Sequence, residues 1–266
     1  MTTGLITLTT DFGYRDPFVG TMKGVILGIN PHARIVDLTH GIPAQDLMAA
    51  ALALGASTPF FPEGTVHVSV VDPGVGSERR ALAIESAGQF FVGPDNGIFT
   101  LALKGKEIRE MVELSNEYYH IKPTSKTFHG RDIFAPVAAH LSLGVPVQKL
   151  GNTVKDYYRL DWPETIKAEG IIQGKVVYID SFGNLITNIY EHDLKTFPSE
   201  DVIVTLGDLR IHGITPSYIH GEKGGYIALI NSWGLLEVSL FKRNAQLSCG
   251  AKIGEKVTIR DRRTAP

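Results

Sequence analysis

Short apolar runs alternate with polar, glycine-containing clusters through the first half of the chain. The clearest run, Val66–Val71, ends at Asp72-Pro73, and the following Gly74 and Gly76 permit a tight turn. Three further runs of this form are Leu5–Thr10, Arg34–Val36 and Gln89–Val92. Apolar runs of this length, bounded by turn residues, predict buried β-strands.

Between these runs, apolar residues recur three and four positions apart, which is the spacing of one helix face. The pattern predicts helices over residues 17–30, 44–58 and 133–143, and a short helix near Phe99. Residues 81–84 and 90–92 are expected to form a strand pair. Strands that alternate with helices predict a Rossmann-like α/β domain with a mostly parallel sheet.

The pattern changes after about Leu160. Residues 161–170 have the composition of a linker, and the segments beyond it are short, rich in β-branched residues and separated by turn residues. These segments predict strands at residues 174–180, 185–190, 201–206, 226–231, 235–240 and 256–260. Such spacing is typical of an antiparallel β-sandwich or barrel. We therefore predict an N-terminal α/β domain at 1–165 and a smaller β-barrel-like domain at 170–266.

Several polar clusters fall at predicted strand ends, and ligands of open α/β sheets bind outside the carboxyl ends of the strands. Asp11 follows the first strand and can accept both hydroxyls of a ribose, or can simply shape a turn. Asp72, Arg79 and His129 form the sharpest set, because an aspartate can orient a water or an imidazole and an arginine can hold it ionised. The alternative roles are a turn residue for Asp72, a solvated surface charge for Arg79 and a helix cap for His129.

The second half contains two more polar clusters. Asp180–Asn184 separates two predicted strands, and composition alone favours a plain hairpin turn there. Asn231–Gly234 is similar, and its polar groups could instead hold an amino-acid zwitterion. Asp95-Asn96-Gly97 is also turn-like and receives no role from the sequence.

Composition narrows the functional classes. The chain has 266 residues, a net charge of −2 and a single cysteine, Cys249, so nucleic-acid binding, an internal disulfide and a cysteine-based zinc site are not expected. The N-terminus lacks a signal-peptide pattern and no apolar stretch suits a membrane span, which predicts a cytoplasmic protein. The motifs GxxxxGK[ST], GxGxxG, HExxH and GxSxG do not occur.

Six motifs, taken in order, resemble one family. They are TTDFG (9–13), VDPGVGSERR (71–80), GPDNG (93–97), FHGRDIFAP (128–136), DSFGNLITNI (180–189), and INSWG (230–234) with RNA (243–245). Together they are similar to the S-adenosyl-L-methionine (SAM) hydroxide adenosyltransferases, which are hydrolytic relatives of the SAM-dependent fluorinase and chlorinase. The resemblance covers nearly the whole chain.

The resemblance implies hydrolysis of SAM to adenosine and L-methionine, by attack of a polarised water on the 5′ carbon, without a metal or other cofactor. It implies a homotrimer in which the ligand lies between the N-terminal domain of one subunit and the C-terminal domain of its neighbour. The implied catalytic residues are Asp72, Arg79 and His129, with the family register favouring Arg79 over Arg80. The implied substrate-binding residues are Asp11, Phe128, Asp180, Phe182, Asn184, Asn231, Ser232, Arg243 and Ala245.

One position separates hydrolysis from halogenation. Halogenating relatives have tyrosine where this chain has Asp72, and a carboxylate would repel a halide by roughly 4 kcal/mol at 4 Å and an effective dielectric of about 20. The same carboxylate can accept a hydrogen bond from water.

Two other functions remain open at this stage. In a metal-dependent nucleoside hydrolase, Asp11 and Asp16, with Asp37, His40 and Asp95, could bind Ca²⁺ through oxygen ligands, although the adjacent aspartate pair of that group is missing and Arg15-Asp16-Pro17 stands in its place. A non-catalytic SAM or adenosine sensor is the other possibility.

Overall fold

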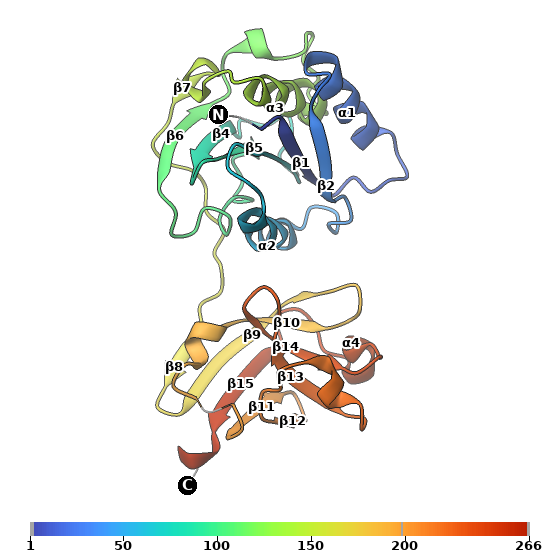
Figure 1. The fold of residues 1–266 in the computed structure, drawn as a ribbon, viewed down its shortest axis with the longest axis vertical. Helices are drawn as coiled ribbons and strands as arrows, with labels where there is room; N and C mark the ends of the chain where they lie inside the picture. Colours follow the sequence, from blue (N-terminus) through green and yellow to red (C-terminus); the bar gives the residue numbers. More distant parts are fainter. Residues whose placement is uncertain (1–2, 198, 265–266) are drawn as a thin grey trace. The chain divides into compact units, whose positions relative to one another are not determined.

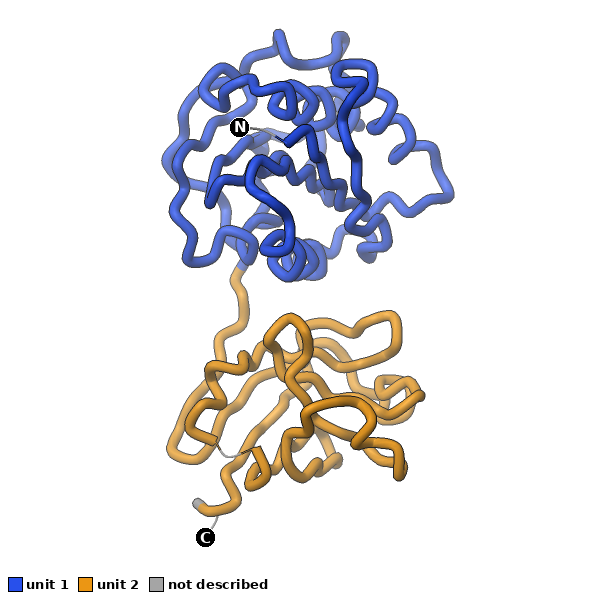
Figure 2. The backbone as a smooth tube through the Cα atoms, in the orientation of Figure 1, with its two compact units in different colours: residues 1–160 blue, residues 161–266 orange. Residues whose placement is uncertain are grey.

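The computed structural model describes residues 3–197 and 199–264. The chain divides into two compact units, residues 1–160 (unit 1) and 161–266 (unit 2), coloured separately in Figure 2. Within the described residues, no helix is both long enough and apolar enough to cross a membrane.

Unit 1 contains a seven-stranded sheet with the strand order β2-β1-β3-β5-β4-β6-β7 (Figure 1). The strands are β1 (Leu5–Thr10), β2 (Arg34–Thr39), β3 (Val66–Val70), β4 (Ala81–Ser86), β5 (Gln89–Pro94), β6 (Ile108–Glu113) and β7 (Asn152–Thr153). The first four in this order pair in parallel, but β4, β6 and β7 pair antiparallel with their neighbours. The sheet is therefore mixed, and the prediction of a mostly parallel sheet was wrong.

The reversal begins at the turn between β4 and β5. Ala87 and Gly88 both have positive φ, at +48° and +74°, and return the chain within two residues. A connection this short can join only antiparallel strands, because a parallel pair needs a crossover of a dozen or more residues. The predicted pairing of these two strands is confirmed.

Three α-helices cover the sheet of unit 1: α1 (Phe18–Ile29), α2 (Leu47–Ser57) and α3 (Ala135–Ser142). In Figure 1, α1 and α3 lie together on one side of the sheet and α2 lies on the other. A π-helical turn, η3 (Gly130–Phe134), leads into α3. The short 3-10 helices of this unit are η1 (Thr58–Phe60), η2 (Glu117–Tyr119) and η4 (Val147–Lys149).

The short helix predicted near Phe99 is absent from the described structure, which has turns there. Gly97 and Gly105 flank this segment with φ values of +93° and +70°. Between these two left-handed glycines the segment forms isolated turns, in which the Thr100 N–H donates to the Gly97 carbonyl and the Leu103 N–H to the Phe99 carbonyl, both at 3.0 Å.

Unit 2 is an antiparallel sheet of eight strands that curls into a barrel-like form, as predicted. Its order is β12-β11-β15-β9-β10-β14-β13, with β8 paired to β9. The strands are β8 (Ile166–Ala168), β9 (Ile171–Ile179), β10 (Leu185–Tyr190), β11 (Val202–Leu206), β12 (Leu209–His212), β13 (Tyr226–Ile230), β14 (Leu235–Leu240) and β15 (Lys256–Asp261). The helices are η5 (Glu191–Leu194), η6 (Tyr218–Gly221), α4 (Ala245–Cys249) and η7 (Arg262–Thr264).

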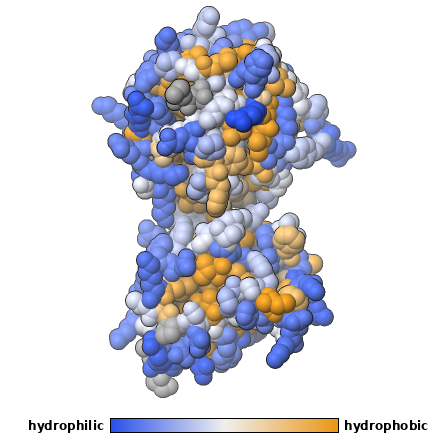
Figure 3. All heavy atoms as spheres, viewed as in Figure 1, coloured by the Kyte–Doolittle hydropathy of each residue, from blue (hydrophilic) through white to orange (hydrophobic). Residues whose placement is uncertain are grey.

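Each unit has its own hydrophobic core. On the face shown in Figure 3, patches of hydrophobic residues lie among hydrophilic ones on both units. The core of unit 1 packs β1 and β3 against α1 and α3, and thereby fixes the strand ends at which Asp11 and Asp72 lie.

Candidate active site

The loop that follows β3 returns the chain on itself. The backbone N–H of Val75 donates to the Asp72 carbonyl at 3.2 Å, and the Ser77 hydroxyl donates to the Gly74 carbonyl at 2.7 Å. Gly76 has a φ of +78°, and a Cβ there would lie 2.4 Å from the Lys126 carbonyl oxygen. These contacts fold residues 71–80 so that the two ends of the loop lie side by side.

The folded loop pairs Asp72 with Arg79. The Arg79 Nε lies 2.9 and 3.1 Å from the two carboxylate oxygens, and Nη2 lies 2.5 Å from Oδ2. Both side chains are buried, with 5% of Asp72 and 10% of Arg79 exposed. The guanidinium also lies over the Phe134 ring, 5.3 Å from its centroid. Two parallel hydrogen bonds between charged groups fix the orientation of this carboxylate.

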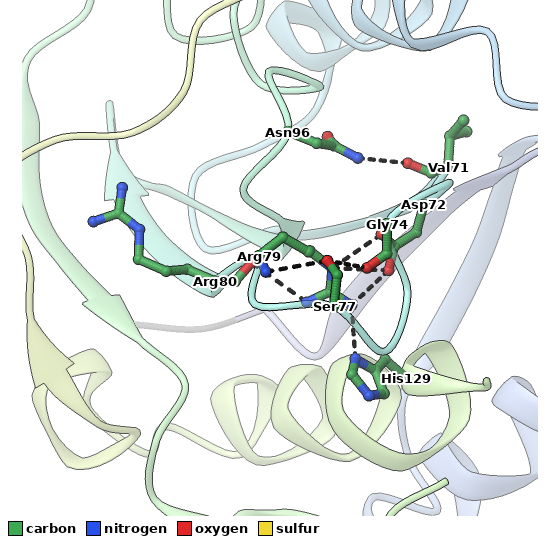
Figure 4. Close-up of polar contacts among 8 residues, drawn as sticks. All are labelled: Val71, Asp72, Gly74, Ser77, Arg79, Arg80, Asn96 and His129. Atoms are coloured by element: carbon green, nitrogen blue, oxygen red, sulfur yellow. Dashed lines mark hydrogen bonds and ion pairs between the residues drawn. The ribbon is translucent and has the colours of Figure 1, made fainter. Parts of the chain in front are cut away.

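His129, just before η3, contacts the same arginine. Arg79 Nη2 lies 2.7 Å from His129 Nδ1. A dashed line marks this contact in Figure 4. A guanidinium only donates, so Nδ1 accepts and the neutral imidazole carries its proton on Nε2. Burial and the Arg79 charge lower the pKa of His129, while Asp72 and Asp132 act in the opposite direction. His129 therefore offers an Nε2–H donor at neutral pH.

The adjacent arginine has different partners. Arg80 pairs with Asp95 at 2.6 Å and with Asp156 at 2.9 Å, and in Figure 4 it points away from His129. The structure thus brings Arg79, and not Arg80, to Asp72 and His129.

Asp11 lies at the neighbouring strand end, and its Oδ2 accepts the backbone N–H of Gln45 at 2.8 Å. The loop after it is tied to His40, whose carbonyl accepts the N–H of Gly13 at 2.8 Å and whose Nδ1 lies 2.7 Å from the Thr10 hydroxyl. A carboxylate has about four lone-pair sites, so Asp11 can accept further hydrogen bonds from a ligand.

Asp11, Asp72 and His129 line a cleft of about 290 Å³ within unit 1. Its polar side holds Asp11, Asp72 and His129, and its apolar side holds Phe12, Phe18 and Phe128, with edge-to-face ring contacts at 5.3 to 6.0 Å. A cleft with one apolar wall and a few fixed polar groups suits a small ligand such as a nucleoside. Sequence reasoning missed Phe12, Phe18 and Gln45, although Phe12 directly follows Asp11.

Unit 2 has its own cavity of about 740 Å³. The predicted residues Asp180, Phe182, Asn184, Asn231, Ser232 and Arg243 line it. Ala245 does not: its side chain is fully buried in the core of unit 2.

The turn at Asp180 shapes this cavity. Asp180 Oδ1 accepts the backbone N–H groups of Phe182 and Asn184 at 2.9 and 2.8 Å, and Oδ2 accepts the Asn184 side-chain amide at 2.8 Å. Phe182 as a whole residue is left 75% exposed. Asp180 thus acts as a turn residue that orients Phe182 and Asn184 towards the cavity. The exposed Phe182 side chain could cover a ligand there.

A buried carboxylate that the sequence did not reveal lies against the same cavity. Glu237 accepts hydrogen bonds from Tyr218 at 2.9 Å, Asn231 at 3.1 Å and Ser239 at 2.5 Å. Burial and the nearby Glu237 charge raise the pKa of Tyr218 to about 12. In a predicted strand, a glutamate is expected to face solvent. Only the fold therefore revealed the hydrogen bonds that converge on Glu237.

Among the residues described, no group of three or more histidines, cysteines or acidic residues is arranged to hold a metal ion. Two of the suggested ligands have cationic partners instead: Lys23 lies 2.7 Å from Asp37, and Arg80 pairs with Asp95.

Comparison with known proteins gives one consistent result. The family model described as the SAM hydroxide adenosyltransferase N-terminal domain matches residues 6–151, and the corresponding C-terminal domain matches residues 174–258. A protein of Methanocaldococcus jannaschii named (R)-S-adenosyl-L-methionine hydrolase is 40% identical over 254 residues, covering 91% of this chain and 90% of its own length.

A more distant relative and a solved structure are also similar to this chain over most of its length. A fluorinase of an Actinoplanes species is 27% identical over 289 residues, covering 96% of this chain and 97% of its own. The crystal structure of an uncharacterized conserved protein from Thermotoga maritima superimposes with a TM-score of 0.90 at 34% identity, covering 96% of this chain and 99% of that one.

Proposed function

Since the chain belongs to the SAM hydroxide adenosyltransferase family, we propose that it hydrolyses SAM to adenosine and L-methionine. The observation that supports this most is that Asp72 and His129, both held by Arg79, line one cleft with Asp11. The relative named above as a hydrolase has the same reaction in its name.

In the proposed reaction, a water attacks the ribose 5′ carbon in line with the carbon–sulfur bond. A C5′–O bond forms, the C5′–S bond breaks, and its electron pair passes to sulfur, so methionine leaves as a neutral thioether. The leaving group needs no proton, and one proton from the water is released. The enzyme's task is to position and polarise that water.

The hydrogen-bond directions at the site divide this task between two residues. Asp72 is the acceptor for the water, because its carboxylate is fixed by Arg79. His129 acts as a donor through Nε2–H, because its Nδ1 already accepts from Arg79. Asp11 takes the ribose hydroxyls, and Phe128 packs on the nucleoside.

We assign the remaining substrate contacts to residues that line the cavity of unit 2. They are Phe182, Asn184, Asn231, Ser232 and Arg243, and Asp180 shapes the turn beside them. Ala245 can contribute only through its backbone. We propose that the two surfaces meet in a homotrimer, each site using unit 1 of one chain and unit 2 of another. The proposed reaction uses no cofactor.

The test is to incubate the purified protein with SAM and follow adenosine and methionine by mass spectrometry, with and without EDTA. We expect both products in equal amounts, unaffected by EDTA. Recovery of intact SAM would indicate a sensor. Activity that EDTA abolishes and Ca²⁺ restores would indicate a metal-dependent nucleoside hydrolase.

Variants identify the site. Asp72→Asn should lower kcat by about 10²- to 10⁴-fold, the typical effect of losing a positioned acid–base group, with adenosine affinity retained. Asp11→Ala should instead raise KM by about 10- to 100-fold, because two hydroxyls lose a charged acceptor. Asp208→Asn, at an exposed turn in unit 2, is the control and should match wild type. Wild-type turnover in Asp72→Asn would contradict the assigned role.

A further inference from the structure

The Gly93–Gly97 segment contacts both ends of the loop that carries Asp72 and Arg79. We propose that Asp95 and Asn96 are positioning residues that hold this loop, residues 71–80, so that Arg79 alone pairs with Asp72 and His129. The proposal rests on the proposed function for its kinetic consequences, and on the contacts below for its geometry.

Strand pairing brings the segment to the loop. β3 and β5 run parallel with Val68 opposite Val92, so the residues after β5 emerge beside those after β3. Gly93 makes this close approach possible, because a Cβ there would lie 2.3 Å from the Ser69 carbonyl oxygen and 3.0 Å from Phe99. The next side chains along the chain are therefore within reach of the Asp72 loop.

Asn96 holds the start of the loop. Its Nδ2 donates to the Val71 carbonyl at 2.8 Å, one residue before Asp72, and this bond is drawn in Figure 4. Its Oδ1 accepts the backbone N–H of Ile98 at 3.3 Å, which sets the direction of the amide. Residue 96 must therefore donate and accept at once, as an amide does.

Asp95 holds the end of the loop. Its backbone N–H donates to the Arg80 carbonyl at 2.9 Å, and its Oδ2 accepts from Arg80 Nε at 2.8 Å. Its Oδ1 accepts the backbone N–H of Tyr158 at 2.7 Å, so both oxygens have partners, and only 6% of the side chain is exposed. The Tyr158 N–H thus orients the Asp95 carboxylate for its pairing with Arg80.

The contacts of Asn96 and Asp95 determine which of the two adjacent arginines pairs with Asp72. Either guanidinium could pair with a single nearby carboxylate, and a loop of glycine and serine offers little to choose between them. Asp95, with Asp156, provides Arg80 with its own anions. Arg79 is left to Asp72 and His129, and loss of the Arg80–Asp95 pair from either side releases the end of the loop and displaces Arg79.

The experiment uses three variants of the full-length protein. Asn96→Ala removes the contact to Val71, while Asp95→Asn and Arg80→Gln each remove the ion pair from one side. Glu85→Gln is the control, because it also breaks an arginine pair on β4, with Arg109, whose side chain is 78% exposed. Each protein is assayed for kcat and KM with SAM and for adenosine binding by calorimetry.

An NMR titration of His129 provides a readout independent of turnover. The Arg79 charge lowers the pKa of His129, so displacement of Arg79 should raise it, whereas a purely structural loss elsewhere would not. The His129 signal among the nine histidines is identified by its disappearance in His129→Gln.

We expect kcat to fall by about 10- to 100-fold in the three variants, since a misplacement near 1 Å can cost that much, with adenosine affinity within about twofold of wild type. The His129 pKa should rise towards its ordinary value. Asp95→Asn combined with Arg80→Gln should be no worse than either alone, because both remove one interaction. Glu85→Gln should match wild type in every measurement.

The proposal is overturned if kcat and the His129 pKa stay at their wild-type values in Asn96→Ala and Asp95→Asn. If Asn96→Ala does not fold, Arg80→Gln, whose side chain is partly exposed, decides the matter alone. If wild type itself leaves SAM intact, the proposed function fails, and the His129 titration still decides whether Asp95 and Asn96 position Arg79.

Discussion

Two histidines of unit 1 are held neutral by different surroundings. His129 meets a guanidinium at the edge of the sheet, which leaves one nitrogen to face a ligand. His67 lies inside β3, where Nδ1 is 2.8 Å from the Thr7 hydroxyl and the ring stacks on Phe91. Burial, with a smaller effect of the Lys106 charge, lowers the pKa of His67 to about 4. At the residue scale, the same type of side chain thus lines a cleft in one place and packs in the core in the other.

The buried His67 predicts a pH dependence of stability. Because its folded-state pKa is about 4 and its ordinary value is 6.5, the folded protein binds fewer protons than the unfolded chain between these values. Stability from this residue is complete above pH 6.5 and is lost as the pH falls towards 4. We expect a loss of about 2 kcal/mol of unfolding free energy between pH 7.5 and pH 5.

Urea unfolding of wild type and His67→Gln at both pH values measures this loss. The other histidines titrate in both proteins, so the difference between the two pH dependences isolates His67. His67→Gln should be less stable at pH 7.5 but should lose about 2 kcal/mol less on acidification. Parallel pH dependences would show that His67 does not titrate in this window.

At the scale of elements, one turn joins the unit 2 cavity to a helix. Gly183, between Phe182 and Asn184, has a φ of +83°, and its carbonyl accepts the N–H of Gln246 in α4. Asn244 caps that helix by accepting the Leu247 N–H at 2.7 Å. The turn that presents the proposed substrate contacts is therefore packed directly on the start of α4.

Alanine substitution separates two effects at this turn. Gly224 has the same φ of +83° with nothing within 4 Å of an added Cβ, so Gly224→Ala should cost only backbone strain, about 1–2 kcal/mol. In Gly183→Ala the Cβ would lie 2.1 Å from Asn244 Cγ, which should add about 1–3 kcal/mol and raise KM for SAM.

Thermal unfolding and SAM kinetics of the two alanine variants provide the comparison. Gly224→Ala should keep the wild-type KM. Equal losses of stability in both variants would mean that the contact with Asn244 relaxes freely, and an unchanged KM in Gly183→Ala would remove this turn from the substrate site.

At the scale of the whole molecule, the proposed site residues are divided between the two units. Asp11, Asp72 and His129 belong to the cleft of unit 1, whereas Asn184 and Ser232 belong to the cavity of unit 2. A homotrimer with shared sites makes a direct prediction. Asp72→Ala and Asn184→Ala should each be nearly inactive, but mixed assemblies should contain some interfaces that pair two intact halves.

Activity should therefore return in part when the two inactive proteins are mixed under conditions of subunit exchange. Native mass spectrometry must first demonstrate mixed trimers. Such trimers without recovered activity, or a fully active monomer, would contradict the shared site. Wild-type protein taken through the same exchange is the control for losses during handling.

The sequence was most informative where a property depends on near neighbours. The runs at residues 5–10 and 66–70 are strands because their apolar length and flanking turn residues leave few alternatives, and helix α1 follows from its spacing of apolar residues. The motifs also placed Asp72, Arg79 and His129 in one hypothesis, and the structure brings these three side chains into contact.

Tertiary structure decided whatever depends on partners distant in the chain. The place of β6 follows from its antiparallel pairing with β4, more than twenty residues away, so a pattern of apolar runs could not reveal the full strand order of the mixed sheet. Glu237 is buried because three hydrogen-bond donors from η6, β14 and the turn after β13 converge on it. The choice of Arg79 over Arg80 depends on Asp95 and Asp156, which lie 15 and 76 residues from Arg80. Local sequence sets backbone conformation, but charge pairing in a folded protein is settled by the groups that the fold brings within hydrogen-bond distance.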